Sequence, residues 1–311
     1  MTALASVPLE LILGQLVLGM INGAFYALLS LGLAVIFGMM NIINFAHGAF
    51  FMLGAFVAWL IGFPNTWLPM ISPGLSVPPW LAVNFWGALI VAPLIVAAFA
   101  LLLERIVIKR IYGLDPHLGL LLTFGMALVI EGIMRNAFGS TGNPYPVPPQ
   151  LRGGFDAGIL FIPYYRLFAV VAAFVICLGT WLVIEKTPIG ARLRAATENP
   201  KLVLSFGVNV PRMIALTYAG GIMLAAAAGV LAAPIYSVNP SMGTNLVVIV
   251  FAVVVIGGMG SIMGSIATGF GLGIVEGLTK VFYPAASSTV IFIIMVVVLT
   301  TRPNGLFGKA R

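Results

Sequence analysis

The sequence predicts an all-α polytopic membrane protein with about eight to nine transmembrane or partly spanning helices. Of its 311 residues, 61% are hydrophobic and only 7% are charged, and no Asp, Glu, Lys or Arg occurs between Glu10 and Glu104. A soluble domain of this size cannot bury so much apolar surface, and the apolar runs suit a hydrocarbon core of roughly 30 Å. The chain is therefore expected to lie in a lipid bilayer.

Charge and cysteine content exclude several other classes. A net charge of +7 would suggest nucleic acid as the partner of a soluble protein, but here the basic residues collect in loops between apolar runs, as they do in membrane proteins. The single Cys177 lies inside an apolar run, so neither a disulfide framework nor a zinc site is expected. No phosphate-binding P-loop sequence occurs, so the chain is not expected to bind or hydrolyse ATP itself.

The first half of the chain contains one full span and then an interrupted one. The N-terminus carries no cleavage signal, so the first apolar run, about 11–37, is expected to remain as a span. Polar residues then interrupt segment 41–62 and leave it short of a full crossing, which indicates a broken or kinked helix. An irregular, proline-rich connection is expected over 63–83. The loop over 139–166 is rich in Pro and Gly, with a small extended piece at 158–162.

The remaining spans are expected over residues 84–103, 118–138, 167–184, 213–233, 246–256, 262–282 and 289–301.

The long polar stretch 185–212 predicts two short capped helices. Thr187 precedes Pro188 and Asn199 precedes Pro200, which are helix-start signals, and Gly207 can end the second helix. In the first helix, Ile189, Leu193 and Ala196 fall on one apolar face. We expect this face to have no partner within the chain and so to dock on another protein. The alternative is an ordinary basic cytoplasmic loop.

Two interrupted segments are candidates for a translocation path, because paired short or broken helices mark the binding region of many transporters. The alternative is that their polar side chains only cap broken helix ends. Asn22 and Tyr26 of the first span are weaker candidates, for which core packing is the favoured interpretation. The candidate path residues are Asn22, Asn41, Asn44, His47, Gly48, Asn245, Gly257, Gly258 and Gly260.

Charged and small residues inside the spans have structural interpretations. Glu131 with Arg135, and Glu276 with Lys280, stand four residues apart and predict ion pairs along a helix. Glycines spaced by four residues predict close helix–helix approach. The two sets are Gly260, Gly264 and Thr268, and Gly269, Gly273 and Gly277.

Four motifs, spread over nearly the whole chain, carry a resemblance to a known family. They are NIINFAHG at 41–48, GGMGSI at 257–262, RPNGLFG at 302–308, and a loop pattern made by Gly190, Arg194, Ala195, Gly207 and Asn209. The chain resembles the branched-chain (hydrophobic) amino-acid permeases of bacterial ABC importers. It departs from many relatives at Ala49, where they carry an acidic residue, and at Met263, where they often carry proline.

The resemblance implies a single permease domain over 1–311 in the bacterial inner membrane, with a coupling loop at 185–212 and an outward loop at 139–166. It implies four partners: a second homologous permease chain, two cytoplasmic ATP-binding subunits and an extracytoplasmic solute-binding protein. ATP and Mg²⁺ would be held by the partner subunits, with no cofactor in this chain. The implied ATPase-coupling residues are Ile189, Gly190, Arg192, Leu193, Arg194, Ala195, Ala196, Gly207 and Asn209.

The basic residues predict the orientation. With 185–212 inside, eleven of the 15 Lys and Arg residues fall on the cytoplasmic side, and Arg135, Arg152, Arg166 and Lys280 fall outside. Because cytoplasmic loops carry an excess of basic residues, the N-terminus is expected outside and the C-terminus in the cytoplasm.

Alternative functions remain open. Permeases for urea or short-chain amides belong to the same superfamily. A stand-alone secondary transporter or channel is the alternative from another class, and it would lack a docking loop and would more often carry a lone ionisable residue at mid-membrane.

Overall fold

The computed structural model describes residues 8–40, 43–72, 74–111, 115–156, 158 and 160–308. Asn41, one of the expected path residues, lies outside these ranges. Apart from one small hairpin, the regular structure in the described ranges is helical. Six of these helices are long and apolar enough to cross a membrane, and three more are apolar but shorter. The predicted fold class is therefore confirmed.

The chain divides into two compact units, each made from separated stretches of sequence. Unit 1 comprises Met1–Asn41, Pro149–Val210 and Val248–Arg311, and unit 2 comprises Ile42–Pro148 and Pro211–Val247.

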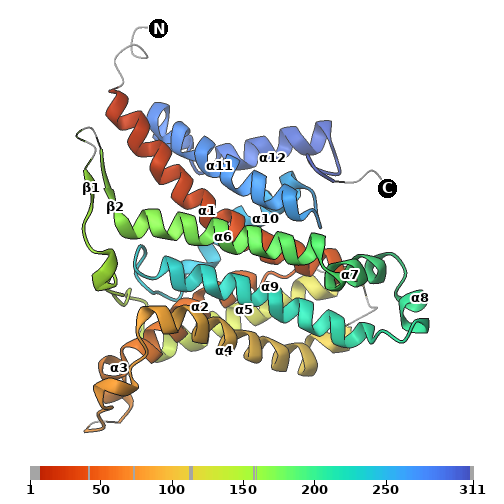
Figure 1. The fold of residues 1–311 in the computed structure, drawn as a ribbon, viewed down its shortest axis with the longest axis horizontal. Coiled ribbons are helices and arrows are strands. Elements are labelled where there is room, and N and C mark those ends of the chain that lie inside the picture. Colours follow the sequence, from red (N-terminus) through yellow and green to blue (C-terminus); the bar gives the residue numbers. More distant parts are fainter. Residues whose placement is uncertain are drawn as a thin grey trace. The chain divides into compact units, whose positions relative to one another are not determined.

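Unit 1 is organised around the long helix α1 (Leu9–Met40), which runs beside α11 (Ile262–Phe282) and α6 (Tyr164–Lys186) (Figure 1). Successive turns of α11 present glycine to α1. A Cβ at Gly269 would lie 2.5 Å from the Cα of Ala27, and one at Gly273 or Gly277 would overlap the α1 backbone. The close approach predicted from the glycine spacing is therefore confirmed, and it explains why the packed face of each helix lacks bulky side chains.

The two ends of α6 carry the other distinctive parts of unit 1. Before it lie β1 (Gly154–Asp156) and β2 (Phe161–Pro163), which pair antiparallel with Phe155 opposite Ile162. After it come α7 (Pro188–Glu198) and α8 (Pro200–Ser205). The 23 residues of α6 extend about 34 Å at 1.5 Å per residue, which is enough to place the hairpin and α7 on opposite sides of a membrane (Figure 1). The unit also contains η4 (Pro149–Leu151), η5 (Pro284–Ala286), α12 (Val290–Thr301) and the second part of α10 (Met242–Gly257).

Unit 2 is built around α2 (His47–Gly62), whose Phe50, Phe51 and Phe56 are fully buried. A helix that is apolar on all sides belongs in a protein interior, and α2 has this character. It contacts α4 (Phe85–Ile106) and α5 (Pro116–Phe138). Its Gly54 leaves no room for a Cβ beside Ala226 of α9 (Val210–Ala232). The unit also contains α3 (Pro64–Ile71), η2 (Pro79–Leu81) and η3 (Ile108–Ile111).

Two local expectations need correction. Part of the connection predicted to be irregular forms the helix α3, because Pro64 takes the first helical position, where its missing N–H costs nothing. The extended piece at 158–162 is one strand of a hairpin and lies slightly later, at Phe161–Pro163. The stretch 139–166 is divided between the units, because residues up to Pro148 belong to unit 2 and residues from Pro149 onward belong to unit 1.

Candidate functional site

The connection from α6 through α7 to α8 follows the predicted caps with one exception. The side chain of Asn199 accepts a hydrogen bond from the N–H of Leu202 at 3.0 Å and so caps α8. Gly207 follows α8 with a φ of 79°, a left-handed conformation that suits glycine. Thr187 stands at the N-cap position of α7, but its side chain makes no capping bond there and its hydroxyl donates to the Val183 carbonyl instead.

The expectation that the apolar face of α7 has no partner in this chain is wrong. Gly190 and Ala196 are buried, and Leu193 lines a cavity together with residues of α1 and α6. α7 contacts α1, α6 and α8, so its apolar face packs on its own unit. Helical periodicity identifies which residues share a face, but not which neighbour that face meets.

A different set of side chains on α7 and α8 is exposed. Ile189, Leu202, Leu204 and Phe206, named here the α7–α8 apolar surface, are large, hydrophobic and exposed, and Phe206 is 78% exposed. Arg192 and Ala195 of α7 are exposed as well, as is Asn209 before α9. Contiguous apolar groups next to charged loops mark contact sites for other proteins.

Arg194 does not extend freely from α7. Its Nη1 donates to the backbone carbonyl of Ile184 at 2.6 Å and to Oε2 of Glu185 at 3.2 Å, and both acceptors belong to the last turn of α6. Beside this contact lies an open cavity of about 380 Å³, lined by residues of α1, α6, α7, the loop before α11 and the start of α11. Its lining includes Val35, Trp181, Leu193 and Met263.

The glycine-rich loop at 257–262 and the C-terminal turn at 302–308 form one arrangement in unit 1. The N–H groups of Leu306 and Phe307 donate to the carbonyls of Ile256 and Gly257, at 2.8 and 3.1 Å. These carbonyls end α10 and would otherwise lack helical donors. A Cβ at Gly305 would lie 2.5 Å from the Cα of Gly258. The two motifs therefore depend on each other sterically.

This contact predicts a clear difference between two glycines with left-handed backbones. Gly305 (φ 82°) packs on Gly258, whereas Gly74 (φ 92°) has no heavy atom within 4 Å of a built Cβ. Gly305→Ala is expected to lower the melting temperature of the detergent-purified chain by several degrees more than Gly74→Ala. In both variants, placing alanine at a positive φ lowers the stability by about 1 kcal/mol, but only Gly305→Ala adds a steric overlap. Equal shifts in a thermal scan would show that the turn does not hold the loop.

The broken segment before α2 is held by polar groups of unit 2. Asn44 is 2% exposed. Its Oδ1 accepts from the N–H of Ala46 at 3.1 Å, and its Nδ2 donates to the Tyr218 hydroxyl of α9 at 3.4 Å. Thr123 of α5 accepts from the N–H of Phe45 at 3.1 Å. These bonds support the capping interpretation of Asn44, and a path-lining role stays a prediction.

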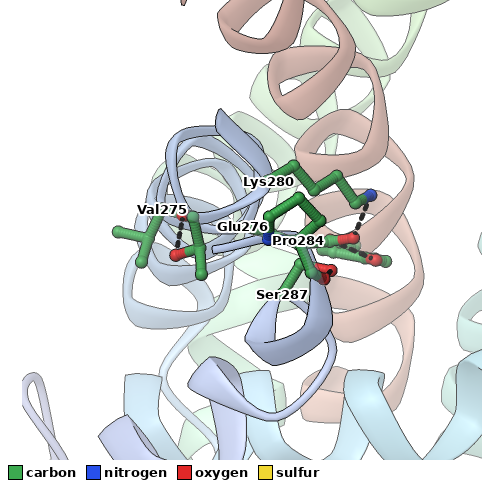
Figure 2. A network of polar contacts seen from close by, with 7 residues as sticks. Val275, Glu276, Lys280, Pro284 and Ser287 are labelled. Carbon is green, nitrogen blue, oxygen red and sulfur yellow. Dashed lines mark hydrogen bonds and ion pairs between the residues drawn. The ribbon is translucent and has the colours of Figure 1, made fainter. Parts of the chain in front are cut away.

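Two acidic residues of the spans make the predicted ion pairs and each gains a hydroxyl from a distant helix. Glu276 accepts from Lys280 Nζ at 2.5 Å (Figure 2). It also accepts from the Tyr26 hydroxyl at 2.7 Å, so α1 and α11 are joined. Glu131 pairs with Arg135 and also accepts from the Thr244 hydroxyl at 2.5 Å. Tyr26 is 4% exposed, which confirms its expected place in the core.

The candidate path residues fall into two groups. Asn44, His47, Gly48 and Asn245 belong to unit 2, and Asn22, Gly257, Gly258 and Gly260 belong to unit 1. Within unit 2, the α2 backbone at Gly48 meets that of Gly243 so closely that neither could carry a Cβ. Sequence reasoning missed Thr123 and Tyr218. The only available signal was a polar group inside an otherwise apolar run.

These features define a class of protein: a polytopic helical membrane protein with short apolar helices beside its long spans and a surface loop of two short helices. Among the described residues, no group of three or more His, Cys, Asp or Glu could hold a metal ion.

Comparison with known proteins makes the class specific. A family model described as "Branched-chain amino acid transport system / permease component" matches residues 15–299. The high-affinity branched-chain amino acid transport system permease protein BraD of Pseudomonas aeruginosa is 31% identical over 304 residues, covering 96% of each chain. The corresponding LivH of Escherichia coli is 28% identical over 311 residues, again covering 96% of each. LivM of the same organism is 26% identical over 318 residues, covering 92% of this chain and 68% of LivM. No solved structure matches the chain.

The chain therefore belongs to this family and is a permease component of a branched-chain amino acid ABC transport system. It is a multi-pass membrane subunit of a larger complex and not itself an enzyme.

Proposed function

We propose that this chain forms the membrane path of a binding-protein-dependent importer for branched-chain or other hydrophobic amino acids. It does so together with a second, homologous permease chain. The complex contains two ATP-binding subunits, one of which docks on the cytoplasmic side of this chain at α7–α8, and an extracytoplasmic solute-binding protein docks on the other side. The similarity to both LivH and LivM, two permease proteins of one organism, supports a homologous partner chain.

The observation that carries the proposal is the α7–α8 apolar surface. Leu202 belongs to α8 and Phe206 directly follows this helix, and both are exposed together with Ile189. Exposed apolar patches rimmed by polar residues are typical contact sites for other proteins. Their place after the last turn of a spanning helix suits a contact that transmits motion into the membrane. The coupling set is accordingly revised: Ile189, Arg192 and Ala195 face outward, while Leu193 and Ala196 hold α7 in place.

The orientation of the chain in the membrane is inferred from the α7–α8 apolar surface and from the distribution of basic residues. If α7–α8 faces the cytoplasm, eleven of the 15 basic residues lie on that side, which agrees with the charge rule for membrane proteins. The N-terminus then lies outside, and the hairpin β1–β2 at the opposite end of α6 meets the solute-binding protein. The chain passes between the two units four times, which supports treating 1–311 as one permease domain.

Two aspartate substitutions at opposite ends of α6 test this proposal. Phe206→Asp places a charge in the ATPase contact without touching the buried core, so retention of the ATP-binding subunits is expected to fall at least about tenfold. Phe161→Asp makes the same change on the exposed hairpin. It is expected to retain the ATP-binding subunits and to weaken binding of the solute-binding protein.

Co-purification of each partner with each full-length variant is the measurement. Retention of the ATP-binding subunits by Phe206→Asp at the wild-type level, with uptake intact, would contradict docking at α7–α8. Loss of both partners from both variants would indicate a general folding defect, which a melting curve of the purified chain detects.

A further inference from the structure

The junction between α6 and α7 contains a backbone carbonyl that the helix itself cannot satisfy. In α6 the carbonyl of Ile184 would accept from the N–H of the residue four positions later, and that residue is Pro188. Proline has no N–H, and the chain leaves the helix at Thr187 with an extended backbone. Because Ile184 is buried, its carbonyl needs another donor.

Arg194 supplies that donor from the middle of α7. Its Nη1 lies 2.6 Å from the Ile184 oxygen and also pairs with Glu185 at 3.2 Å. A guanidinium at the C-terminal end of a helix also interacts favourably with the partial negative charge there. The Glu185 carboxylate holds the guanidinium in place, although both side chains are about half exposed and this ion pair is therefore weak.

Gly190 allows this contact to form. It is buried, and a Cβ there would overlap the same Ile184 carbonyl oxygen. Pro188, Gly190 and Arg194 therefore act around one atom: the first removes its helical donor, the second lets α7 approach it, and the third replaces the donor. The bonding of the Ile184 carbonyl therefore explains why these three residues occur at this spacing in the loop.

The rest of α7 is attached less firmly than Gly190 and Arg194, because it is held by side-chain packing. The cavity of about 380 Å³ lies along it, lined by Leu193 and Thr197 of α7 and by Val35 and Gly38 of α1. A helix beside an open cavity has few atoms opposing its movement on that side. The contact of Gly190 and Arg194 with Ile184 is thus the firm attachment of α7 to α6.

We propose that Arg194 is a positioning residue that clamps α7 to the end of α6, so that the two helices move as one body during transport. Movement imposed on α7–α8 then reaches the far end of α6 instead of being lost by bending at Thr187. This inference rests on the proposed docking of ATP-binding subunits at α7–α8, and its structural part can be tested without them.

The structural test measures the attachment in the full-length chain in nanodiscs. Spin labels at Val171→Cys on α6 and Glu198→Cys on α7, both exposed positions, are placed in a Cys177→Ala background. Arg194→Ala is expected to broaden the label–label distance distribution at least about twofold. Glu185→Gln, which keeps an acceptor for Arg194 and leaves the carbonyl bond, is expected to broaden it much less. An unchanged distribution in Arg194→Ala overturns the clamp.

The functional test uses the complex with its ATP-binding subunits. Arg194→Ala is expected to retain these subunits and hydrolyse ATP, while uptake per ATP hydrolysed falls at least about fivefold. Arg194→Lys, which keeps the charge but not the planar fork, is expected to lie in between. A merely structural role would instead lower both rates in parallel, and that result would also overturn the proposal. If Arg194→Ala does not fold, Arg194→Gln replaces it, because glutamine keeps one N–H donor but no charge.

The Phe206→Asp and Arg194→Ala experiments together distinguish failure of the docking proposal from failure of the clamp proposal. If Phe206→Asp keeps the ATP-binding subunits while Arg194→Ala still broadens the distances, the docking proposal fails and the clamp stands. If Phe206→Asp loses them and Arg194→Ala changes neither distances nor coupling, docking stands and the clamp fails.

Discussion

Gly273→Leu is expected to prevent the chain from accumulating as a folded membrane protein. Gly273 lies where α11 crosses α1, and even a single Cβ there would overlap Gly19 and Gly23 of α1. These neighbours are backbone atoms, which cannot turn aside as a flexible side chain can. Overpacking in a well-packed core costs about 1–3 kcal/mol and sometimes more, and here a whole isobutyl group must enter a backbone contact.

The control lies two residues away on the same helix. Gly271 has no heavy atom within 4 Å of a built Cβ and is exposed, so Gly271→Leu adds the same side chain where lipid or solvent can receive it. We expect that variant to be recovered at nearly the wild-type level. The measurement is the amount and melting temperature of monodisperse protein after detergent extraction. Similar recovery of both leucine variants would contradict close packing of α1 on α11.

Lys280→Met is expected to destabilise unit 1 by about 3–5 kcal/mol, because it leaves a buried carboxylate without its counter-charge. Glu276 is only 7% exposed. It accepts one bond from Lys280 and one from Tyr26, which is 250 residues away in the sequence. The hydroxyl of Tyr26 alone cannot balance a negative charge in a membrane protein interior.

A double variant distinguishes the effect of the lost charge from the effect of changed packing. Lys280→Met with Glu276→Gln removes both charges and keeps an acceptor for Tyr26, so most of the lost stability is expected to return. The coupling energy from the double-mutant cycle is then large and favourable. Tyr26→Phe is expected to cost about 1.5–3 kcal/mol, as for one hydrogen bond to a charged group. If the double variant is no more stable than Lys280→Met, the carboxylate is not the source of the cost.

Sequence reasoning succeeded wherever one stretch of chain carries its own signal. Apolar runs placed α4, α5, α6, α9 and α11 to within a few residues. Asn199 and Gly207 act on α8 as predicted, because capping depends on neighbours three or four residues away. The four-residue spacing of Gly269, Gly273 and Gly277 predicted close helix approach, although it could not name α1 as the partner.

The apolar face of α7 shows where such reasoning stops. Ile189, Leu193 and Ala196 share a helical face in the sequence, but Ala196 is 2% exposed and Ile189 is 64% exposed. The face turns inward over most of its length because Gly190 and Arg194 attach α7 to α6. Whether an apolar stripe is covered by its own chain or offered to a partner depends on neighbours that periodicity does not identify.

The membrane class, the family, the order and bounds of most helices and the cap of α8 could be predicted from the sequence, because each depends on hydrophobicity and on short spacings along the chain. The sequence could not predict the contacts between distant residues. Arg194 bonds Ile184, Thr123 and Tyr218 hold the broken segment, and Tyr26 reaches Glu276. The physical reason is that a buried polar group must find a donor or acceptor wherever the fold brings one. In this chain the hydrogen-bond partners are Arg194, which follows Pro188 in the sequence, and residues of other helices.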